Sequence, residues 1–188
     1  MLQPIILSGR VQEETSDGSI GSSTGRGAGR SVVFFVQPNI SESGSTSYAE
    51  IEGIRQAANI MIYMGSPSRT FSIEATFVSR SVQEAEATLG YVNTLRSWRM
   101  PEQSPGSGVK APARIFLTGL NGQFKQISVR MMDLNITLNE DVDYIVVPEQ
   151  GAVPIVWNVS MTLKEARSIQ ELGMFNIQQF RQGTLDGW

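Results

Sequence analysis

The residues best suited to chemistry in this sequence form one acidic cluster, Asn139-Glu140-Asp141-Val142-Asp143. Three carboxylates this close together can bind a hard cation such as Ca²⁺ or supply an acid–base pair. A solvated turn between two strands is the more frequent use of such a cluster, and no second cluster supplies the remaining ligands. We therefore expect neither a metal site nor a catalytic residue here.

Two other motifs invite a chemical interpretation. The run from Gly25 to Ser31 looks like a phosphate loop, but it lacks the lysine and the spacing of that motif and precedes a strand. Arg96 and Arg99 share one helix face, where they can bind an anion, face solvent or form a salt bridge across an interface. The solvated face and the salt bridge are the preferred interpretations.

The absence of two residue types narrows the chemistry further. The chain has no histidine and no cysteine, which excludes Ser–His–Asp triads, cysteine nucleophiles, disulfides and nearly every zinc site. The aromatic residues are scattered, with no stacking platform interleaved with basic residues of the kind that single-strand binders use. The sequence thus predicts a protein that is not an enzyme and has no cofactor.

Composition favours one domain with weakly charged faces. Of 188 residues, 40% are hydrophobic, enough for a single core, and we expect one domain over 1–188. Charged residues make up only 18%, as in subunits covered by neighbours or in an ordinary neutral surface. The net charge of −3 provides no basic field for nucleic acid or an anionic membrane. No signal peptide or membrane span is recognisable, so we expect synthesis in the cytoplasm.

The first third of the chain alternates loops and strands. Residues 1–31 form an N-terminal segment with a Gly/Ser-rich flexible loop over Ser16–Ser31. The apolar run Ser31–Val36 is typical of a strand covered on both faces. Ser41–Ser47 is expected to be a polar loop. Asn59–Met64 fits a strand or a short helix, and we favour the strand.

A regular strand and a helix follow. Residues 71–78 alternate between apolar and polar side chains, which predicts a strand with one buried face. Ser81 and Glu84 have the spacing of a capping box, and an apolar stripe then predicts a helix over about 82–99. Pro101 prevents its continuation, and residues 101–112, with a flexible centre at Ser104–Gly108, are expected to form a loop.

Three strands and an arm complete the chain. Strands are expected over Arg114–Thr118, Gln126–Leu138 and Val153–Lys164, and the apolar face of the second switches near Met132-Asp133, which predicts a β-bulge. The β-rich core thus covers 32–165, and the fold class is α+β, mainly β. Residues 166–188 form a C-terminal arm that either folds back or reaches a neighbouring subunit, and we favour the neighbour.

Four stretches in order resemble one family. They are Tyr48 to Ile54, Arg69 to Phe77, Val92 to Pro101, and Asp141 to Tyr144 taken with Val156 to Glu165. The set is similar to the tail-tube initiator and baseplate-hub tube proteins of contractile-tailed bacteriophages. In that family a regularly alternating strand leads to a helix that ends in Leu-Arg-Ser-aromatic-x-x-Pro. A late strand ends in Leu-x-Glu.

The resemblance implies a fold and an assembly. The fold would be the tail-tube fold, a β-sandwich or half-barrel flanked by one long helix, with six copies joined into a ring around a lumen. The chain would be a structural virion protein that forms a hexameric ring at the baseplate end of the tail tube, joining the hub to the tube and lining the DNA channel. Its partners would be its own copies, the adjacent hub and tube rings and baseplate wedge proteins. DNA would pass only transiently, which suits an acidic chain.

Intersubunit contacts are expected at the helix end, at one turn and in the arm. The candidate residues are Arg96, Trp98, Arg99, Tyr144, Ile169, Leu172, Phe175 and Phe180. Two alternatives remain open, an ordinary tail-tube or head–tail adaptor subunit and a β-domain that binds a small ligand or carbohydrate. No membrane is expected to take part.

Overall fold

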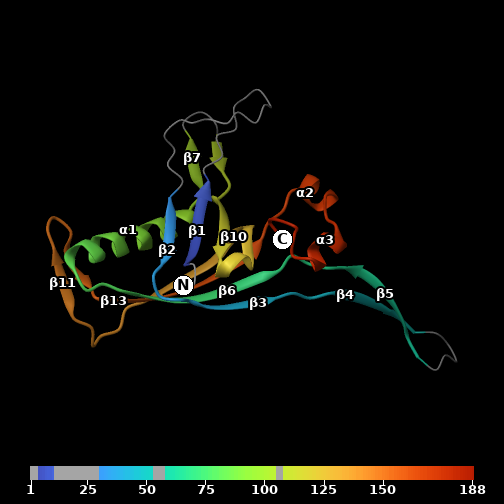
Figure 1. Cartoon of the computed structure of the whole chain (residues 1–188), viewed down its shortest axis with the longest axis horizontal. Coiled ribbons are helices and arrows are strands. Elements are labelled where there is room, and N and C mark those ends of the chain that lie inside the picture. The colour runs from blue at the N-terminus through green and yellow to red at the C-terminus, as the bar shows by residue number, and fades with distance from the viewer. Residues whose placement is uncertain (1–3, 11–29, 53–57, 105–107) are drawn as a thin grey trace.

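The computed structural model describes residues 4–10, 30–52, 58–104 and 108–188. Its main element is a seven-stranded antiparallel sheet in the order β2-β1-β9-β10-β13-β6-β3 (Figure 1). These strands are β1 (Ile5–Arg10), β2 (Ser31–Phe34), β3 (Asn39–Ser43), β6 (Thr70–Val78), β9 (Arg114–Gly119), β10 (Phe124–Thr137) and β13 (Val156–Glu165). The predicted fold class, α+β and mainly β, is confirmed.

Hairpins and helices extend from this sheet. The hairpins pair β4 (Ser47–Ile51) with β5 (Ile60–Gly65), β7 (Glu102–Ser104) with β8 (Gly108–Lys110), and β11 (Tyr144–Val147) with β12 (Gly151–Pro154). The helices are α1 (Val82–Arg99), the 3₁₀ turn η1 (Leu120–Gly122), α2 (Ile169–Gly173) and α3 (Ile177–Arg181).

The sheet is curled, as one short connection shows. Strands β2 and β3 lie at opposite edges of the sheet, yet only residues 35–38 join them. Seven flat strands would separate these edges by about 29 Å. The chain from Phe34 to Asn39 reaches at most about 18 Å. The edges must therefore approach one another, and Phe34 of β2 indeed stacks on Phe77 of β6 with ring centroids 5.4 Å apart.

Strand β10 forms the corner of the curl. Its first half pairs with β9 and its second half with β13, and the register shifts twice, between Phe124 and Ile127 and between Met131 and Asp133. Gln126, inside the first shift, has a φ of 54°, a left-handed conformation that bulges favour. The second shift confirms the bulge predicted near Met132-Asp133.

Strands β6 and β13 supply most of one core wall. Phe71, Ile73, Ala75 and Phe77 are buried on β6 while the residues between them are exposed, as predicted. The alternation of β13 is equally regular, but this strand begins at Val156. The expected start at Val153 was wrong because Ile155 leaves the sheet, where its amide donates to the Asp143 carbonyl at 2.9 Å.

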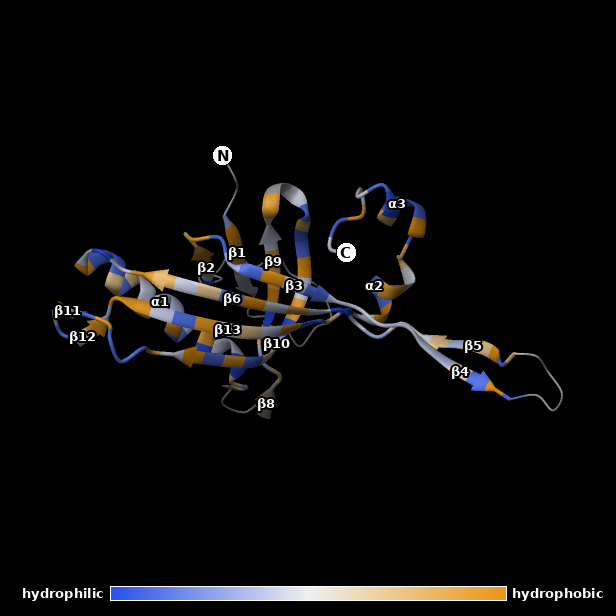
Figure 2. Cartoon of the chain, turned by 90° about the horizontal axis from the view of Figure 1, so that it is seen from below, coloured by the Kyte–Doolittle hydropathy of each residue, from blue (hydrophilic) through white to orange (hydrophobic). Residues whose placement is uncertain are grey.

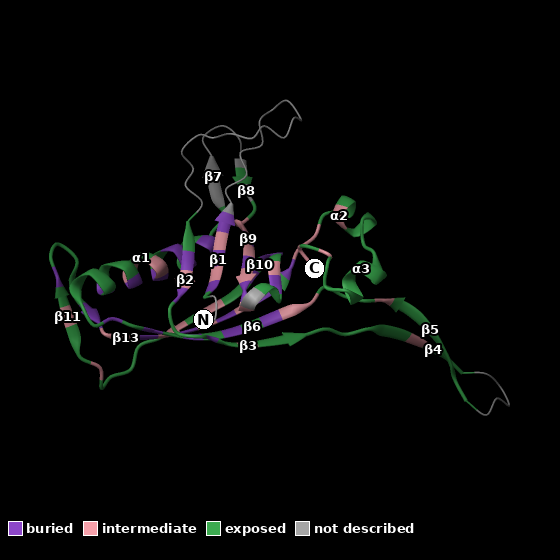
Figure 3. Cartoon of the chain, in the orientation of Figure 1, coloured by how far each residue is buried: buried purple, intermediate pink, exposed green. Residues whose placement is uncertain are grey.

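Helix α1 has the predicted bounds and covers one side of the sheet (Figure 3). The Ser81 hydroxyl accepts from the Glu84 amide at 3.2 Å, but the Glu84 carboxylate accepts from the Arg80 amide, so the capping box is only half formed. Ala85, Val92 and Leu95 are fully buried. The buried apolar residues of the described part form one cluster between the curled sheet and α1.

Several loop predictions were wrong. Within Ser41–Ser47, β3 runs to Ser43 and β4 starts at Ser47; residues 101–112 include the β7–β8 hairpin. Phe35 is 78% exposed, so the run Ser31–Val36 is not covered on both faces. Residues 16–29 of the predicted Gly/Ser-rich loop, and 105–107 of the loop Ser104–Gly108, lie outside the described residues.

Candidate intersubunit interface

The β4–β5 hairpin leaves the sheet where β3 ends and β6 begins, and it extends away from the rest of the described chain (Figures 1 and 2). We call residues 47–51 and 60–65 the projecting hairpin. Its two strands pair with one another from Ser47↔Gly65 to Ile51↔Ile60. The register shifts beside Gly65, whose φ of 152° is strained for any other residue, so a bulge lies at the root of the hairpin.

Apolar side chains of the projecting hairpin face solvent on both sides. Every residue from Ile60 to Met64 is exposed, as are Tyr48 and Ile51 on the opposite strand. Tyr48 and Tyr63 touch edge to face at 5.8 Å across the ribbon. A two-stranded ribbon on its own is only marginally stable in water, and exposed apolar patches of this kind mark contact surfaces. The hairpin thus has the composition of a segment that another chain covers.

Charged residues gather where the hairpin joins the sheet. We call Glu42, Arg69, Glu165 and Arg167 the root cluster. Arg69 Nη1 lies 2.8 Å from Glu42 Oε1, while its Nε and Nη2 donate to the two carboxylate oxygens of Glu165 at 3.2 and 2.9 Å. Arg167 Nε donates to Glu165 Oε1 at 2.8 Å. One carboxylate thus binds two arginines, one of them in a bidentate geometry.

Burial gives this cluster its strength. The side chain of Glu165 is 6% exposed and that of Arg167 is 8% exposed. Burial by itself would raise the pKa of the Glu165 carboxyl, but the hydrogen bonds from Arg69 and Arg167 outweigh it and leave that pKa below its ordinary value. Glu165 is therefore an ionised, fully paired group at the end of β13.

The C-terminal arm, residues 166–188, begins at this cluster. No apolar residue of the arm is buried, and Ile169 and Met174 are 89% and 74% exposed. Its aromatic residues contact one another, with the ring of Phe175 at 4.5 Å from Trp188 and 5.8 Å from Phe180. The guanidinium of Arg167 lies 3.2 Å above the ring of Trp188.

Polar contacts hold the arm beside its own sheet. Arg114 Nη2 bonds Glu171 Oε1 at 2.5 Å, and Lys125 Nζ donates to the Gly183 carbonyl at 2.8 Å. The Gly187 amide donates to the Lys125 carbonyl at 2.7 Å. The arm thus lies along its own sheet, which is the alternative not favoured from the sequence, while its apolar side chains stay exposed.

The structure places the predicted contact residues in three separate regions. Ile169, Leu172, Phe175 and Phe180 lie together in the arm and are all exposed. Tyr144, 58% exposed on β11, lies at the opposite end of the molecule from the arm (Figure 1).

The helix-end candidates divide. Arg96 and Arg99 are exposed in the last turn of α1, where positive charge suits the helix dipole, and neither forms an ion pair with another described residue. Trp98 is only 5% exposed, and a Cβ built on Gly9 of β1 would lie 2.5 Å from its Nε1. As a core side chain it has almost no surface for a neighbour, so its assignment as a contact was wrong.

Two groups of residues were missed in the sequence. The sequence did contain a signal for the projecting hairpin. A strand with one face in solvent alternates between apolar and polar residues, but the odd and the even positions of Ile60–Met64 are all apolar, which indicates that both faces are covered. The root cluster had a weaker one. Arg69 and Glu165 stand at the ends of two of the stretches that carry the family resemblance, but nothing in the sequence shows that they meet.

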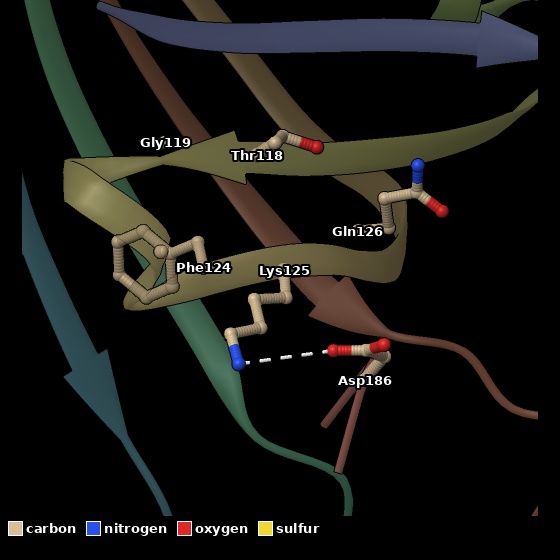
Figure 4. Close-up of a pocket in the computed structure, with 7 residues that line it drawn as sticks. Thr118, Gly119, Phe124, Lys125, Gln126 and Asp186 are labelled. Carbon is tan, nitrogen blue, oxygen red and sulfur yellow. Dashed lines mark ion pairs between the residues drawn. The ribbon is translucent and has the colours of Figure 1, made fainter. Parts of the chain in front are cut away.

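An open pocket of about 330 Å³ lies beside the turn between β9 and β10 (Figure 4). It is lined by Thr118, Gly119, Gly122, Phe124, Lys125, Gln126 and Asp186. Lys125 Nζ and Asp186 Oδ1 face one another at 3.8 Å, and no second carboxylate lines the pocket. The lining therefore lacks the paired carboxylates of a glycosidase.

The acidic cluster lies in an exposed turn between β10 and β11. Among the described residues, no group of three or more His, Cys, Asp or Glu is placed to hold a metal ion. The helices in that same part of the chain are all too short or too polar to cross a membrane. No protein-family model matches the sequence, and no curated protein matches it either.

Proposed function

We propose that this chain is a structural subunit that forms a six-membered ring at the baseplate end of a contractile phage tail tube, between the hub and the tube. The projecting hairpin carries the proposal, because it is an apolar ribbon whose large side chains no described residue of its own chain buries. The order and spacing of the motifs that resemble the tube-initiator family supply the sixfold symmetry and the phage context.

The geometry of the hairpin suits a ring. The five residues of β4 span about 16 Å at 3.3 Å per residue, enough to reach onto the surface of a neighbouring subunit. Docking one segment into a different surface of the next copy is a head-to-tail contact, and such contacts close into rings when the rotation allows it. Each large apolar side chain covered in this way contributes about 1.5–3 kcal/mol.

The C-terminal arm supports the same assembly. Its apolar side chains lie exposed while polar contacts hold its backbone, so it can offer a surface to an adjacent subunit or ring. The net charge of −3 is consistent with a channel that lets DNA pass without retaining it, because each phosphate contact would add affinity.

Methionines allow a matched test. Met61 and Met64 of the hairpin are 59% and 66% exposed, and Met132 of β10 is 60% exposed. We expect the double variant Met61→Ser and Met64→Ser to abolish incorporation into particles, and Met132→Ser to leave it unchanged. The readout is the copy number of the chain in reconstructions of particles assembled with each variant. A copy number other than six in the native particle, or full incorporation of the double variant, would contradict the proposal.

A further inference from the structure

The exits of the projecting hairpin and of the C-terminal arm lie side by side. Arg69 is the last residue before β6, and Arg167 is the second residue after β13. Strands β6 and β13 are neighbours in the sheet, with Lys164 paired to Thr70, and the Glu165 amide donates to the Arg69 carbonyl at 2.9 Å. Both segments therefore leave the sheet at one place, and Glu165 stands between them.

Neither segment has its direction fixed by apolar packing. The hairpin strands and the arm contain no buried apolar residue in the described part of the chain. Directional contacts must then set how each one leaves the sheet, and the root cluster provides them. Arg69 also binds Glu42 on β3, the sheet strand that leads into the hairpin, so the cluster joins the two sheet strands at the hairpin root.

We infer that Glu165 is a positioning residue, an ionic latch that fixes the hairpin and the arm in one mutual orientation. Its bidentate bond to Arg69 holds the hairpin, and its bond to Arg167 holds the arm. Loss of this one carboxylate leaves two partly or fully buried cations without their common partner, which favours movement of both. This inference rests on the proposed function in one respect, the identity of the surfaces against which the hairpin and the arm dock.

Amide hydrogen exchange on the free subunit tests the latch. Glu165→Gln is expected to raise exchange in both the hairpin and the arm by about tenfold or more, with amides at the centres of β6 and β13 unchanged. Two controls remove one attachment each. Glu42→Gln should affect the hairpin alone, and Glu171→Gln, which loses the ion pair with Arg114, should affect the arm alone.

Two results would overturn the inference. One is a Glu165→Gln protein in which only one segment loosens. The other is an equal acceleration in the core strands, which would make Glu165 an ordinary stabilising residue. If the Glu165→Gln protein does not fold, the Arg167→Gln variant takes its place. Arg167→Gln removes the bond between Glu165 and the arm and leaves the bond between Glu165 and Arg69 in place. The latch then requires faster exchange in the hairpin too, by about threefold, and an unchanged hairpin refutes it.

Ring formation is measured separately from this exchange. A protein that never forms a ring can still show the latch in its free subunit. A ring that forms from subunits without coupled exchange would keep the proposed function and remove the latch.

Discussion

At the end of α1, the ring of Trp98 fills the space that a side chain on Gly9 would occupy, and this contact joins the helix to β1. The sequence spacing indicates that Trp98 is buried, because Trp98 follows Val92 and Leu95 at three-residue intervals on the buried face of α1. From the sequence, Trp98 was nevertheless assigned to an intersubunit contact. Nothing in the sequence marks Gly9 as its partner.

This contact predicts the effect of one methyl group. In Gly9→Ala the new Cβ would lie 2.5 Å from Nε1 and 2.8 Å from Cε2 of Trp98, so the ring or β1 must move. We expect the free energy of unfolding to fall by about 1–3 kcal/mol. Gly90→Ala is the control, since the Cβ there meets nothing within 4 Å, and it should stabilise α1 by about 0.5–1 kcal/mol. Urea titration measures the free energy of unfolding of both variants. Equal changes in Gly9→Ala and Gly90→Ala would show that the Gly9–Trp98 contact has room for a methyl group.

Among the elements, burial explains part of what was predicted. The strand predicted over Asn59–Met64 is confirmed by the exposed strand β5, whereas β1 was not predicted although Ile5 and Leu7 are buried. Strand β6 was found because burial forces its side chains to alternate. Strand β3 looks like a loop because, at the sheet edge, only Ile40 is partly buried and the other four residues are polar and exposed. Pairing with β6 makes it a strand. The interface candidates also differ in how far the sequence predicted them. The candidates in the arm were recognised as apolar residues left over after the last strand, whereas the projecting hairpin was predicted only as a strand and not as an interface.

The arm provides a prediction at this scale. Phe175→Ala removes the ring that contacts both Phe180 and Trp188, but it removes no buried residue. The free energy of unfolding of the free subunit should change by less than about 1 kcal/mol. Association should weaken by about 2 kcal/mol or more if the arm anchors a neighbour.

Calorimetry of the free subunit and quantitative incorporation into particles measure these two effects. Gln182→Ala, in the same arm and exposed, is the control and should change neither. A large drop in melting temperature would place Phe175 in the fold, whereas unchanged incorporation would remove the arm from the interface.

For the whole molecule, acid should reveal the root cluster. The Glu165 carboxyl keeps its charge to lower pH in the folded chain than in the unfolded one, because Arg69 and Arg167 hold its pKa below the ordinary value of 4.5. Unfolding in acid therefore takes up a proton at this site. Its contribution to stability is complete above about pH 4.5 and is lost as the pH falls through the folded pKa.

Unfolding free energies measured between pH 7 and pH 3 check this. Glu165→Gln should lower the stability at neutral pH and flatten its decline in acid. Glu140→Gln, which changes an exposed carboxylate in the turn before β11, should keep the decline of the unchanged protein. Identical profiles for the unchanged protein and Glu165→Gln would show that the root cluster does not stabilise the fold.

The order of the strands in the sheet has a consequence for synthesis. Strands β3 and β6 pair with each other early, but β6 meets its other neighbour, β13, only after residues 79–155 have been made. The ribosome needs about 4–17 s for the 87 residues from Val78 to Glu165 at about 5–20 residues per second. During that interval the apolar face of β6, with Phe71, Ile73 and Phe77, has no sheet to join, so the nascent chain is open to aggregation or to a chaperone until the last strand emerges.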